Sequence, residues 1–476
     1  MDTRTMYGRQ VITTNVNEIT AANVVAVLQK AMETHEKNRG EIEYLWNYYR
    51  GKQPILTRTK TVRPEICNKI VENRANEIVS FKVGYLCGEP IQYVGRNSDE
   101  SAGKGVGVLN EYMFLVDKPA LDREIVEWGM ICGTANRMVL ANDQYEKDGD
   151  EVPFDMFTLD PRDSFVVYSS DVKRRRLMGV KYNTDEFGQK TYSVYTDSET
   201  FLIEGDKIVS SDKHALGTVP IFEYPANNAR LGAFEIVLPL LDSINNIESN
   251  RMDGIEQFIQ SFMKFINCEI TKEKFEELKD MGGIQIKSIE GQPADVDIVT
   301  SELNQGQTQI TKEDVYKAIL SICGLPSMSD GSTSDSSNNG AVILKNGWQG
   351  AETRAKDSEL MFKRAEKEML RLVLRVCETL ADLKLKLKDL DMKFTRRNYD
   401  NIQSKAQVLA TMLQQPKVHP LLAFTHCGMF SDPESAYTMS NAYYEEQMAK
   451  WEPVDVDEDE DNMTDVDEEN ANVRAS

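Results

Sequence analysis

The stretch FEIVLPLLDSINNIESNRMDGIEQFIQSFMKFINCEI, residues 234–270, decides the fold that the sequence predicts. Its apolar side chains recur every three or four positions, the spacing of one face of an α-helix. These side chains are Leu240, Ile244, Ile247, Ile255, Phe258, Phe262 and Phe265. At about 1.5 Å per residue this helix would be roughly 50 Å long, far beyond the average helix of a globular domain. A helix of this length indicates an element that projects from the body of the protein.

A second helix is predicted after a small insert. Residues 271–306 hold short α and β patterns, and residues 308–323 return to helical spacing before Gly324 ends the helix. Two helices that flank a small insert form an antiparallel stalk with the insert at its tip. Such a stalk exposes apolar side chains, Phe258 among them, unless neighbouring subunits cover them. The sequence therefore predicts assembly into a ring.

The chain before this stalk changes from helical to β-rich. Helical spacing is predicted over residues 18–37, from residue 41 to Gly51, and over residues 64–82. Between residues 90 and 224, β-branched and aromatic residues alternate in short segments that turns separate, with one helix near residues 120–132. The predicted strands are residues 154–159, 165–168, 178–182, 191–196 and 201–204. The fold class expected from this mixture is α+β.

The chain after the stalk begins with a segment that cannot pack a core. Residues 327–339, SMSDGSTSDSSNN, contain no apolar side chain after Met328, so we expect a flexible, solvent-facing loop. A helical pattern follows the loop and continues to about residue 387, and a strand at residues 390–394 comes next. The remainder to about residue 449 is predicted as helices.

The charge of the chain is strongly negative, at −22. Residues 450–476 hold eleven acids against Lys450 and Arg474, so this tail contributes −9, leaves −13 on the body, and is expected to be disordered. An acidic body disfavours tight, static binding of DNA, but it suits a passage through which DNA slides without sticking. No stretch is apolar enough for a membrane helix, and the first residues lack the pattern of a signal peptide, so a soluble protein made in the cytoplasm is expected.

No constellation for catalysis or for a cofactor stands out. The sequence contains no Walker loop, no G-x-S-x-G and no H-E-x-x-H, and the Gly-rich residues 103–107 lack the Gly-Lys-Ser/Thr of a phosphate loop. Seven cysteines without a C-x-x-C pair favour free thiols over disulfides or zinc. His419, His426 and Cys427 are better explained as a packed helix end than as a metal site. The acidic tail resembles an incomplete calcium loop, with Asn462 where Gly is required, so we expect at most loose association with divalent cations.

Three stretches of sequence carry a resemblance to a known family. They are residues 46–51 (WNYYRG), residues 68–90 (NKIVENRANEIVSFKVGYLCGEP) and residues 219–224 (VPIFEY) leading into residues 240–245 (LLDSIN). With the order of elements described above, residues 20–445 resemble the portal proteins of tailed bacteriophages with long non-contractile tails. None of these stretches is a catalytic signature, so the resemblance implies a protein without a catalytic residue.

The resemblance implies a ring, usually of twelve subunits, at one vertex of a phage capsid, assembled in the cytoplasm of the host bacterium. Double-stranded DNA would be packaged and ejected through the ring. The terminase large subunit, head completion or adaptor proteins, and the major capsid and scaffold proteins would be its partners. The implied division of the chain is N-terminal helices and β-rich wing 1–233, stem helix 234–270, clip 271–306, stem helix 307–326, tunnel loop 327–339, long wing helix and strand 340–399, helical crown 400–449 and acidic tail 450–476.

Three groups of residues are candidates for these functions. The tunnel loop would touch passing DNA through Ser329, Asp330, Ser332, Thr333, Ser334, Asp335, Ser336, Ser337 and Asn338, and because it has no basic residue it favours guidance or sealing over gripping. Charges on the stem that could face the channel are Lys264, Lys312 and Lys317, although ordinary solvated lysines explain them equally well. Residues of the clip that could dock partners are Lys274, Glu277, Lys279 and Lys287.

Two other classes of protein stay open at this stage. The stalk could be the partner-binding arm of a phage or cellular scaffold, in which case the protein would remain a monomer or dimer. An undetected hydrolase or nucleotide-binding enzyme would respond to mutation of a single acid or histidine, which a portal would not.

Overall fold

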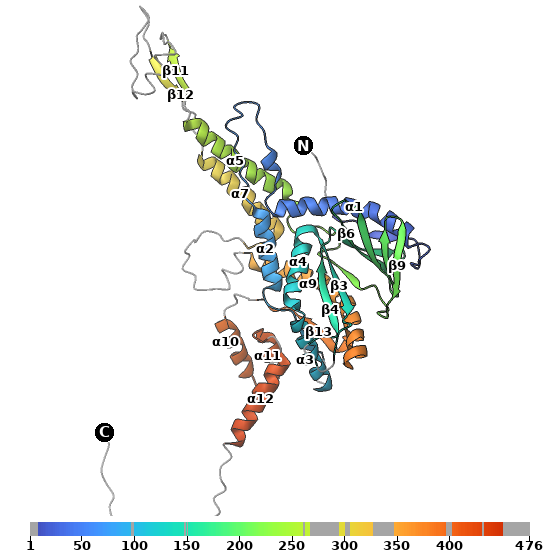
Figure 1. The fold of residues 1–476 in the computed structure, drawn as a ribbon. Coiled ribbons are helices and arrows are strands. Elements are labelled where there is room, and N and C mark those ends of the chain that lie inside the picture. Colours follow the sequence, from blue (N-terminus) through green and yellow to red (C-terminus); the bar gives the residue numbers. More distant parts are fainter. Residues whose placement is uncertain are drawn as a thin grey trace, which may run out of the picture. The chain divides into compact units, whose positions relative to one another are not determined.

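The computed structural model describes residues 8–96, 100–146, 149, 151–259, 262–266, 295–299, 305–326, 347–396, 402–430 and 433–450. Helices and small sheets make up an α+β fold, as predicted (Figure 1). The chain divides into two compact units, Met1–Tyr399 and Asp400–Ser476. The four sheets found among the described residues all belong to the first unit.

The largest sheet has six strands in the order β1-β5-β6-β7-β8-β9. The strands are β1 (Ile12–Thr14), β5 (Ser164–Ser169), β6 (Arg176–Thr184), β7 (Lys190–Tyr195), β8 (Glu199–Glu204) and β9 (Lys207–Lys213). β1 joins β5 in parallel, and the remaining neighbours pair antiparallel. Val167, Val180 and Phe201 are buried on the face that packs against Val24 and Leu28. The strands predicted over residues 165–168, 178–182, 191–196 and 201–204 are confirmed as β5 to β8.

Val24 and Leu28 belong to helix α1 (Val24–Tyr49), which is one continuous helix. The sequence predicted two helices separated near Gly40. The break does not occur, because the buried side chains of α1 continue on one face from His35 through Ile42 to Tyr48. Packing of that face outweighs the roughly 1 kcal/mol that a glycine costs inside a helix.

A second sheet, in the order β10-β3-β4, packs against helices α4 and α9, and α2 packs against α4. Its strands are β3 (Thr134–Ala141), β4 (Phe154–Leu159) and β10 (Ile221–Pro225), and the helices are α2 (Arg74–Cys87), α4 (Lys118–Cys132) and α9 (Trp348–Ala381). α4 ends at Gly133, whose φ is +81° and where a Cβ would lie 2.1 Å from the carbonyl oxygen of Arg230. Only glycine fits that close approach.

Helix α9 is fixed to this sheet by a buried cluster of charges around Glu366. Its carboxylate lies 2.9 Å from Lys118 Nζ and 3.4 Å from Arg137 Nη1, and it accepts hydrogen bonds from Tyr93 and Tyr224. Burial alone would raise the pKa of Glu366, but the attraction to Lys118 and Arg137 is larger. The net effect is a pKa below the ordinary value of a glutamate. A charge without contact to water is stabilised only by such partners. The cluster therefore sets the position of α9 along the sheet.

One more helix, a two-stranded sheet and a 3-10 helix complete this region. α3 (Glu100–Leu115) contains the Gly-rich residues 103–107, which are helical and form no loop. β2 (Gln92–Gly95) pairs with β13 (Leu390–Lys393), the strand predicted after the long helix. A short 3-10 helix, Leu387–Asp389, precedes β13.

The stalk differs from its prediction in one respect. After the 3-10 turn Glu235–Val237, α5 spans Leu238–Ile259 and ends about ten residues early, because β11 (Phe262–Ile266) pairs antiparallel with β12 (Asp295–Val299). The prediction of one helix over residues 234–270 is therefore wrong at its end. α7 (Gln305–Cys323) agrees with the second predicted helix and stops at Gly324, whose φ is +68°.

Residues 64–73 also differ from their prediction. The helix expected over residues 64–82 begins only at Arg74, after a short 3-10 helix at Pro54–Thr57 and a chain without regular structure. α9 ends before residue 387, at Ala381, because Asp382 adopts a left-handed conformation with φ 56°.

The second unit contains α10 (Ile402–Leu413), α11 (Pro420–Cys427) and α12 (Pro433–Ala449), as the helical pattern of residues 400–449 predicted.

Candidate channel and assembly site

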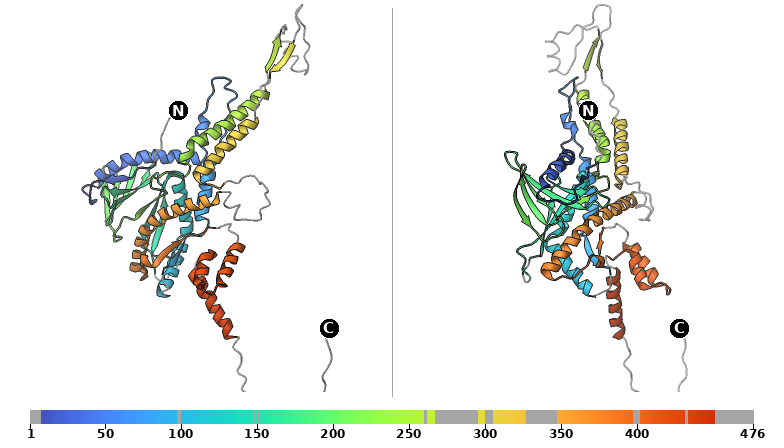
Figure 2. Two further views of the ribbon diagram at one scale, coloured as in Figure 1. Left: turned by 180° about the vertical axis from the view of Figure 1, so that it is seen from behind. Right: turned by 90° about the vertical axis from the view of Figure 1, so that its right-hand side faces the viewer.

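Helices α5 and α7 form the projecting helix pair that the sequence predicted. They lie side by side in every view (Figures 1 and 2). Polar contacts join them along their length: Arg251 Nη1 of α5 donates to Gln309 Oε1 of α7 at 3.1 Å, and Lys312 Nζ lies 2.6 Å from Glu248 Oε1. Because the chain leaves along α5 and returns along α7, the pair is antiparallel.

An extended segment runs along α5 and clamps it to the body of the first unit. We call residues 67–73 the strap. The backbone N–H groups of Asn68, Ile70 and Glu72 donate to Asp253 Oδ1 at 2.7 Å, Ser249 Oγ at 3.0 Å and Asn245 Oδ1 at 2.8 Å. The three acceptors are buried in the structure.

The strap can follow α5 because two residues of the strap and four residues of the helix advance by nearly the same distance. Two residues of extended chain advance about 6.6 Å. Four residues of α-helix advance about 6.0 Å. Alternate strap residues therefore meet side chains at positions 253, 249 and 245 of α5, one helical turn apart and running in the opposite direction. The side chains of α5 thus replace the neighbouring strand that an extended segment normally requires.

Asp253 is the most heavily used acceptor of the strap. Besides the backbone of Asn68 it accepts the Asn68 side-chain amide at 3.0 Å, and it pairs with Arg58 Nη1 at 3.1 Å and with Lys60. Burial raises the pKa of Asp253, but the hydrogen bonds from Lys60 and Asn68 outweigh burial and lower it below 3.8. The carboxylate therefore stays ionised and holds the basic residues before the strap against the stem.

A second set of contacts fixes α7 to the strap and to α2. Lys312 Nζ also lies 2.9 Å from Glu72 Oε2, so one ammonium joins α7, α5 and the strap. Tyr316 donates to Glu77 Oε1 at 2.6 Å and lies under the Arg74 guanidinium, 4.2 Å from the ring centre. Burial and the hydrogen bond to Glu77 raise the pKa of Tyr316 to about 12, so its hydroxyl remains a donor. The base of the helix pair is thereby held from two sides.

Other faces of the pair carry apolar side chains that its own chain does not cover. Ile310 is 61% exposed, Ile322 41% and Met252 36%. Isolated exposed apolar residues are ordinary on protein surfaces, but here they occur on a narrow projection with little body around it. Lys317 is also exposed on α7.

The structure places the three predicted stem lysines differently. Lys264 lies in β11, opposite Asp297 of β12, so its assignment to a helix is wrong. The charge of Lys312 is offset by Glu72 and Glu248 within the subunit, which argues against a free charge in a channel. Lys317 forms no ion pair with the residues that the structure describes. Of the three predicted lysines, Lys317 therefore remains the candidate for an unpaired charge on a stem helix.

The remaining predicted site residues lie outside the described part of the chain. These are the tunnel-loop residues from Ser329 to Asn338 and the clip residues Lys274, Glu277, Lys279 and Lys287. Sequence reasoning missed the acceptors Asn245, Ser249 and Asp253. Their spacing of four residues was visible, but polar residues also fill most other positions between 242 and 254, so the pattern did not stand out.

The residues considered above as a possible metal site lie at the two ends of helix α11. His419 caps α11, its Nδ1 accepting the N–H of Leu421 at 3.2 Å, and Cys427 is buried at the other end of that helix. Among the described residues, no three His, Cys, Asp or Glu side chains gather as a metal site would require. None of the described helices has the length and apolar character needed to cross a membrane.

The described geometry is a pair of helices that projects from the body of the first unit and is fixed to it at its base. A family model described as "Phage portal protein, SPP1 Gp6-like" matches residues 28–461, and the chain belongs to this family of phage portal proteins. The resemblance predicted from the sequence is thus confirmed.

The chain is similar to a solved structure titled "Neck of empty GTA particle computed with C6 symmetry", with 10% sequence identity and a TM-score of 0.43 over 75% of this chain and 90% of that chain. No curated protein matches the chain.

Proposed function

We propose that this chain assembles into a ring that forms a channel for double-stranded DNA at one vertex of a phage capsid. The ring serves as the passage for packaging and ejection and has no catalytic role. It docks the terminase motor and the head-tail connector proteins. The observation that carries the proposal is the α5/α7 pair, whose base is fixed by the strap and whose Ile310 and Met252 are left without cover.

The ring explains both properties of the helix pair. Copies of α5 and α7 placed around an axis cover one another's exposed apolar side chains, which a single subunit cannot do. The strap resists bending of the pair where it leaves the body, and a channel wall under load requires such stiffness. Family membership supports the same assembly.

Within this proposal, the low positive charge of the stem favours sliding of DNA. Arg58, Lys60, Arg251 and Lys312 all have acidic partners, so little charge is left to bind phosphates. We assign guidance or sealing to residues 327–339 and partner docking to residues 271–306. The acidic tail, residues 450–476, associates at most loosely with divalent cations.

Ring assembly is the direct test. Negative-stain microscopy and native mass spectrometry of the full chain are expected to show ring-shaped particles with a central hole, and the measured mass gives the number of subunits. Ile310→Glu introduces a charge into the proposed interface and is expected to shift the mass toward single subunits. Ile310→Val keeps the surface apolar and is the matched control, which should still form rings. A wild-type protein that remains a monomer or dimer would instead support a scaffold arm.

Deleting residues 329–338 tests the channel assignment separately. Rings are expected to form normally, while packaging or retention of DNA fails in an assembled particle. Loss of the rings themselves would make this segment part of the subunit interface and remove it from the channel.

A further inference from the structure

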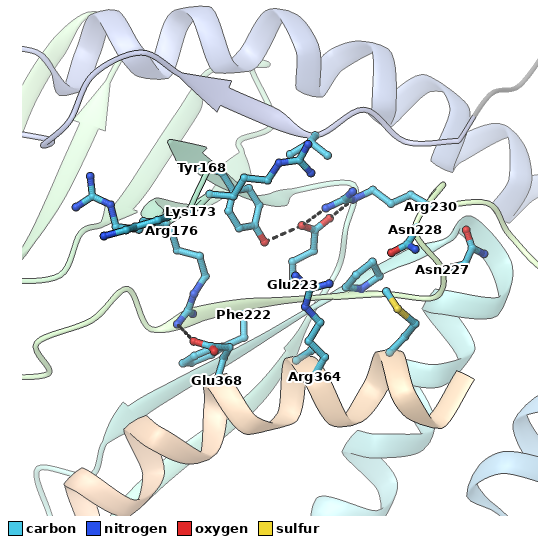
Figure 3. A pocket seen from close by; sticks show the side chains of 16 residues that line it. Tyr168, Lys173, Arg176, Phe222, Glu223, Asn227, Asn228, Arg230, Arg364 and Glu368 are labelled. Atoms are coloured by element: carbon cyan, nitrogen blue, oxygen red, sulfur yellow. Dashed lines mark hydrogen bonds and ion pairs between the residues drawn. The ribbon is translucent and has the colours of Figure 1, made fainter. Parts of the chain in front are cut away.

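A basic pocket of about 510 Å³ opens on the first unit, away from the helix pair. It is bounded by the β5–β6 turn, by β10 with the loop after it, and by one face of α9 (Figure 3). Six lysine and arginine residues line it against two acids, Glu223 and Glu368. In a chain of net charge −22, a pocket with this balance is unusual.

Two of the arginines form the fixed floor of the pocket. Arg230 binds both oxygens of Glu223 at 2.8 and 2.9 Å, and Tyr168 donates to the same carboxylate at 2.8 Å. Arg176 donates to the carbonyl oxygens of Val219 at 3.2 Å and Ile221 at 3.1 Å. These groups are satisfied by the protein, so they hold the shape of the pocket, and their charges are offset by Glu223 and, at 3.9 Å from Arg176, by Glu368.

Three other cations at the opening have no such partner. Lys173 and Arg174 on the β5–β6 turn and Arg364 on α9 are exposed, and within the described part of the chain none of them forms an ion pair. Arg364 rises from α9 toward β10, on the opposite side of the pocket from the turn (Figure 3). An anion bound in the pocket supplies the opposite charge that these three side chains lack within the described part of the chain.

The ligand class follows from the number of uncommitted cations. A carboxylate carries one negative charge on two oxygens, and one guanidinium can bind both of them, as Arg230 binds Glu223 in the same pocket. Three cations that line one pocket without an ion pair among the described residues match a group with more negative charge and more acceptor oxygens, and phosphate is the common biological group of this kind. The volume also lies in the range that holds a nucleotide-sized ligand, about 300–1,000 Å³.

We propose that this pocket binds phosphate groups, with Lys173, Arg174 and Arg364 as the ligand-binding cations. The phosphate belongs either to a free nucleotide or pyrophosphate or to the backbone of DNA. The pocket lies outside the stem, and its argument rests on its own geometry, so it goes beyond the function as a channel.

Binding measurements on the assembled full-length protein distinguish the two sources. Pyrophosphate and a nucleoside triphosphate are titrated by calorimetry, and a fluorescent 12-base-pair duplex is titrated by anisotropy at several salt concentrations. Saturable binding of the small anions assigns a free phosphate ligand. Binding of the duplex alone, with an affinity that falls steeply with salt, assigns the DNA backbone.

Variants locate the site. Arg364→Glu and Lys173→Glu are each expected to weaken binding at least about tenfold, the usual effect of losing one charge-assisted contact. Lys367→Glu is the matched control: it makes the same charge change three residues further along α9, on an exposed residue that does not line the pocket, and should change binding less than twofold.

Three results would overturn the proposal: no binding of any phosphate probe by the wild-type protein, equal effects of Arg364→Glu and Lys367→Glu, or tighter binding of a poly-glutamate peptide than of pyrophosphate. The last would assign the pocket to an acidic protein segment. Ring formation is measured on the same samples, so failure of this site is separable from failure of the channel function.

Discussion

Replacing Asp253 with alanine tests whether the strap fixes the helix pair to the body of the protein. The change removes a buried carboxylate that accepts two hydrogen bonds from Asn68 and pairs with Arg58 and Lys60. Each lost hydrogen bond costs about 1 kcal/mol. The two cations retain partial access to water, so we assign only about 0.5 kcal/mol to each pair. The expected loss in free energy of unfolding is about 3 kcal/mol.

Matched variants separate the contributions. Ser249→Ala removes one accepted hydrogen bond, from the backbone of Ile70, and should cost about 1 kcal/mol. Asp253→Asn keeps an acceptor for the Asn68 backbone but loses the charge, so its cost should fall between those of the two alanine variants. Urea denaturation of the full chain gives these free energies, provided that the slope against urea is unchanged.

Hydrogen exchange of the backbone amides gives a sharper test of the same geometry. The N–H groups of Asn68, Ile70 and Glu72 donate to α5, whereas those of Lys69 and Val71 have no acceptor among the described residues. Exchange is therefore expected to be slow and fast at alternate residues, and Asp253→Ala should speed the exchange of Asn68. Uniform exchange across the five amides would refute the strap as described, even if the stability changes agreed.

Two further predictions concern the core of the first unit. Glu366→Gln leaves the buried cations Lys118 and Arg137 with less compensating charge and should lower the free energy of unfolding by about 3–5 kcal/mol in urea denaturation, while Lys367→Gln on the exposed face of α9 should change it by less than about 0.5 kcal/mol. Burial lowers the pKa of His35 from 6.5 to about 4, so between these pH values the unfolded chain binds a proton that the folded chain does not. Stability therefore falls by up to about 3 kcal/mol as pH drops from 6.5 to 4, and His35→Phe should reduce that slope in denaturation curves measured across this range.

The predicted elements that proved correct are those whose pattern is local. β4 and β8 are short segments rich in aromatic and β-branched side chains, and each has a turn on both sides, so the local composition identifies them. α12 begins at Pro433, a residue that favours the first turn of a helix. In these segments nothing distant in the chain competes with the local preference.

The predictions that failed depend on partners far away in the sequence. The helical period of residues 64–73 is real, but the segment is extended because α5, about 180 residues later, offers acceptors at the matching repeat. The segment from Phe262 to Ile266 satisfies a helical pattern equally well, and pairing with Asp295–Val299 decides in favour of a strand. Short apolar runs are ambiguous between the two structures, and only tertiary contacts resolve them.

The distribution of charge connects the strap, the helix pair and the pocket. Along the base of the helix pair nearly every basic side chain has an acid within ion-pair distance: Arg58 and Lys60 meet Asp253, and Lys312 meets Glu72 and Glu248. The pocket beside α9 shows the opposite, since its uncommitted cations remain at an opening large enough for a ligand. Under the two proposals made above, the stem offers DNA a weakly interacting surface, and the pocket is a separate site for phosphate. The two surfaces differ in how many of their cations are already paired.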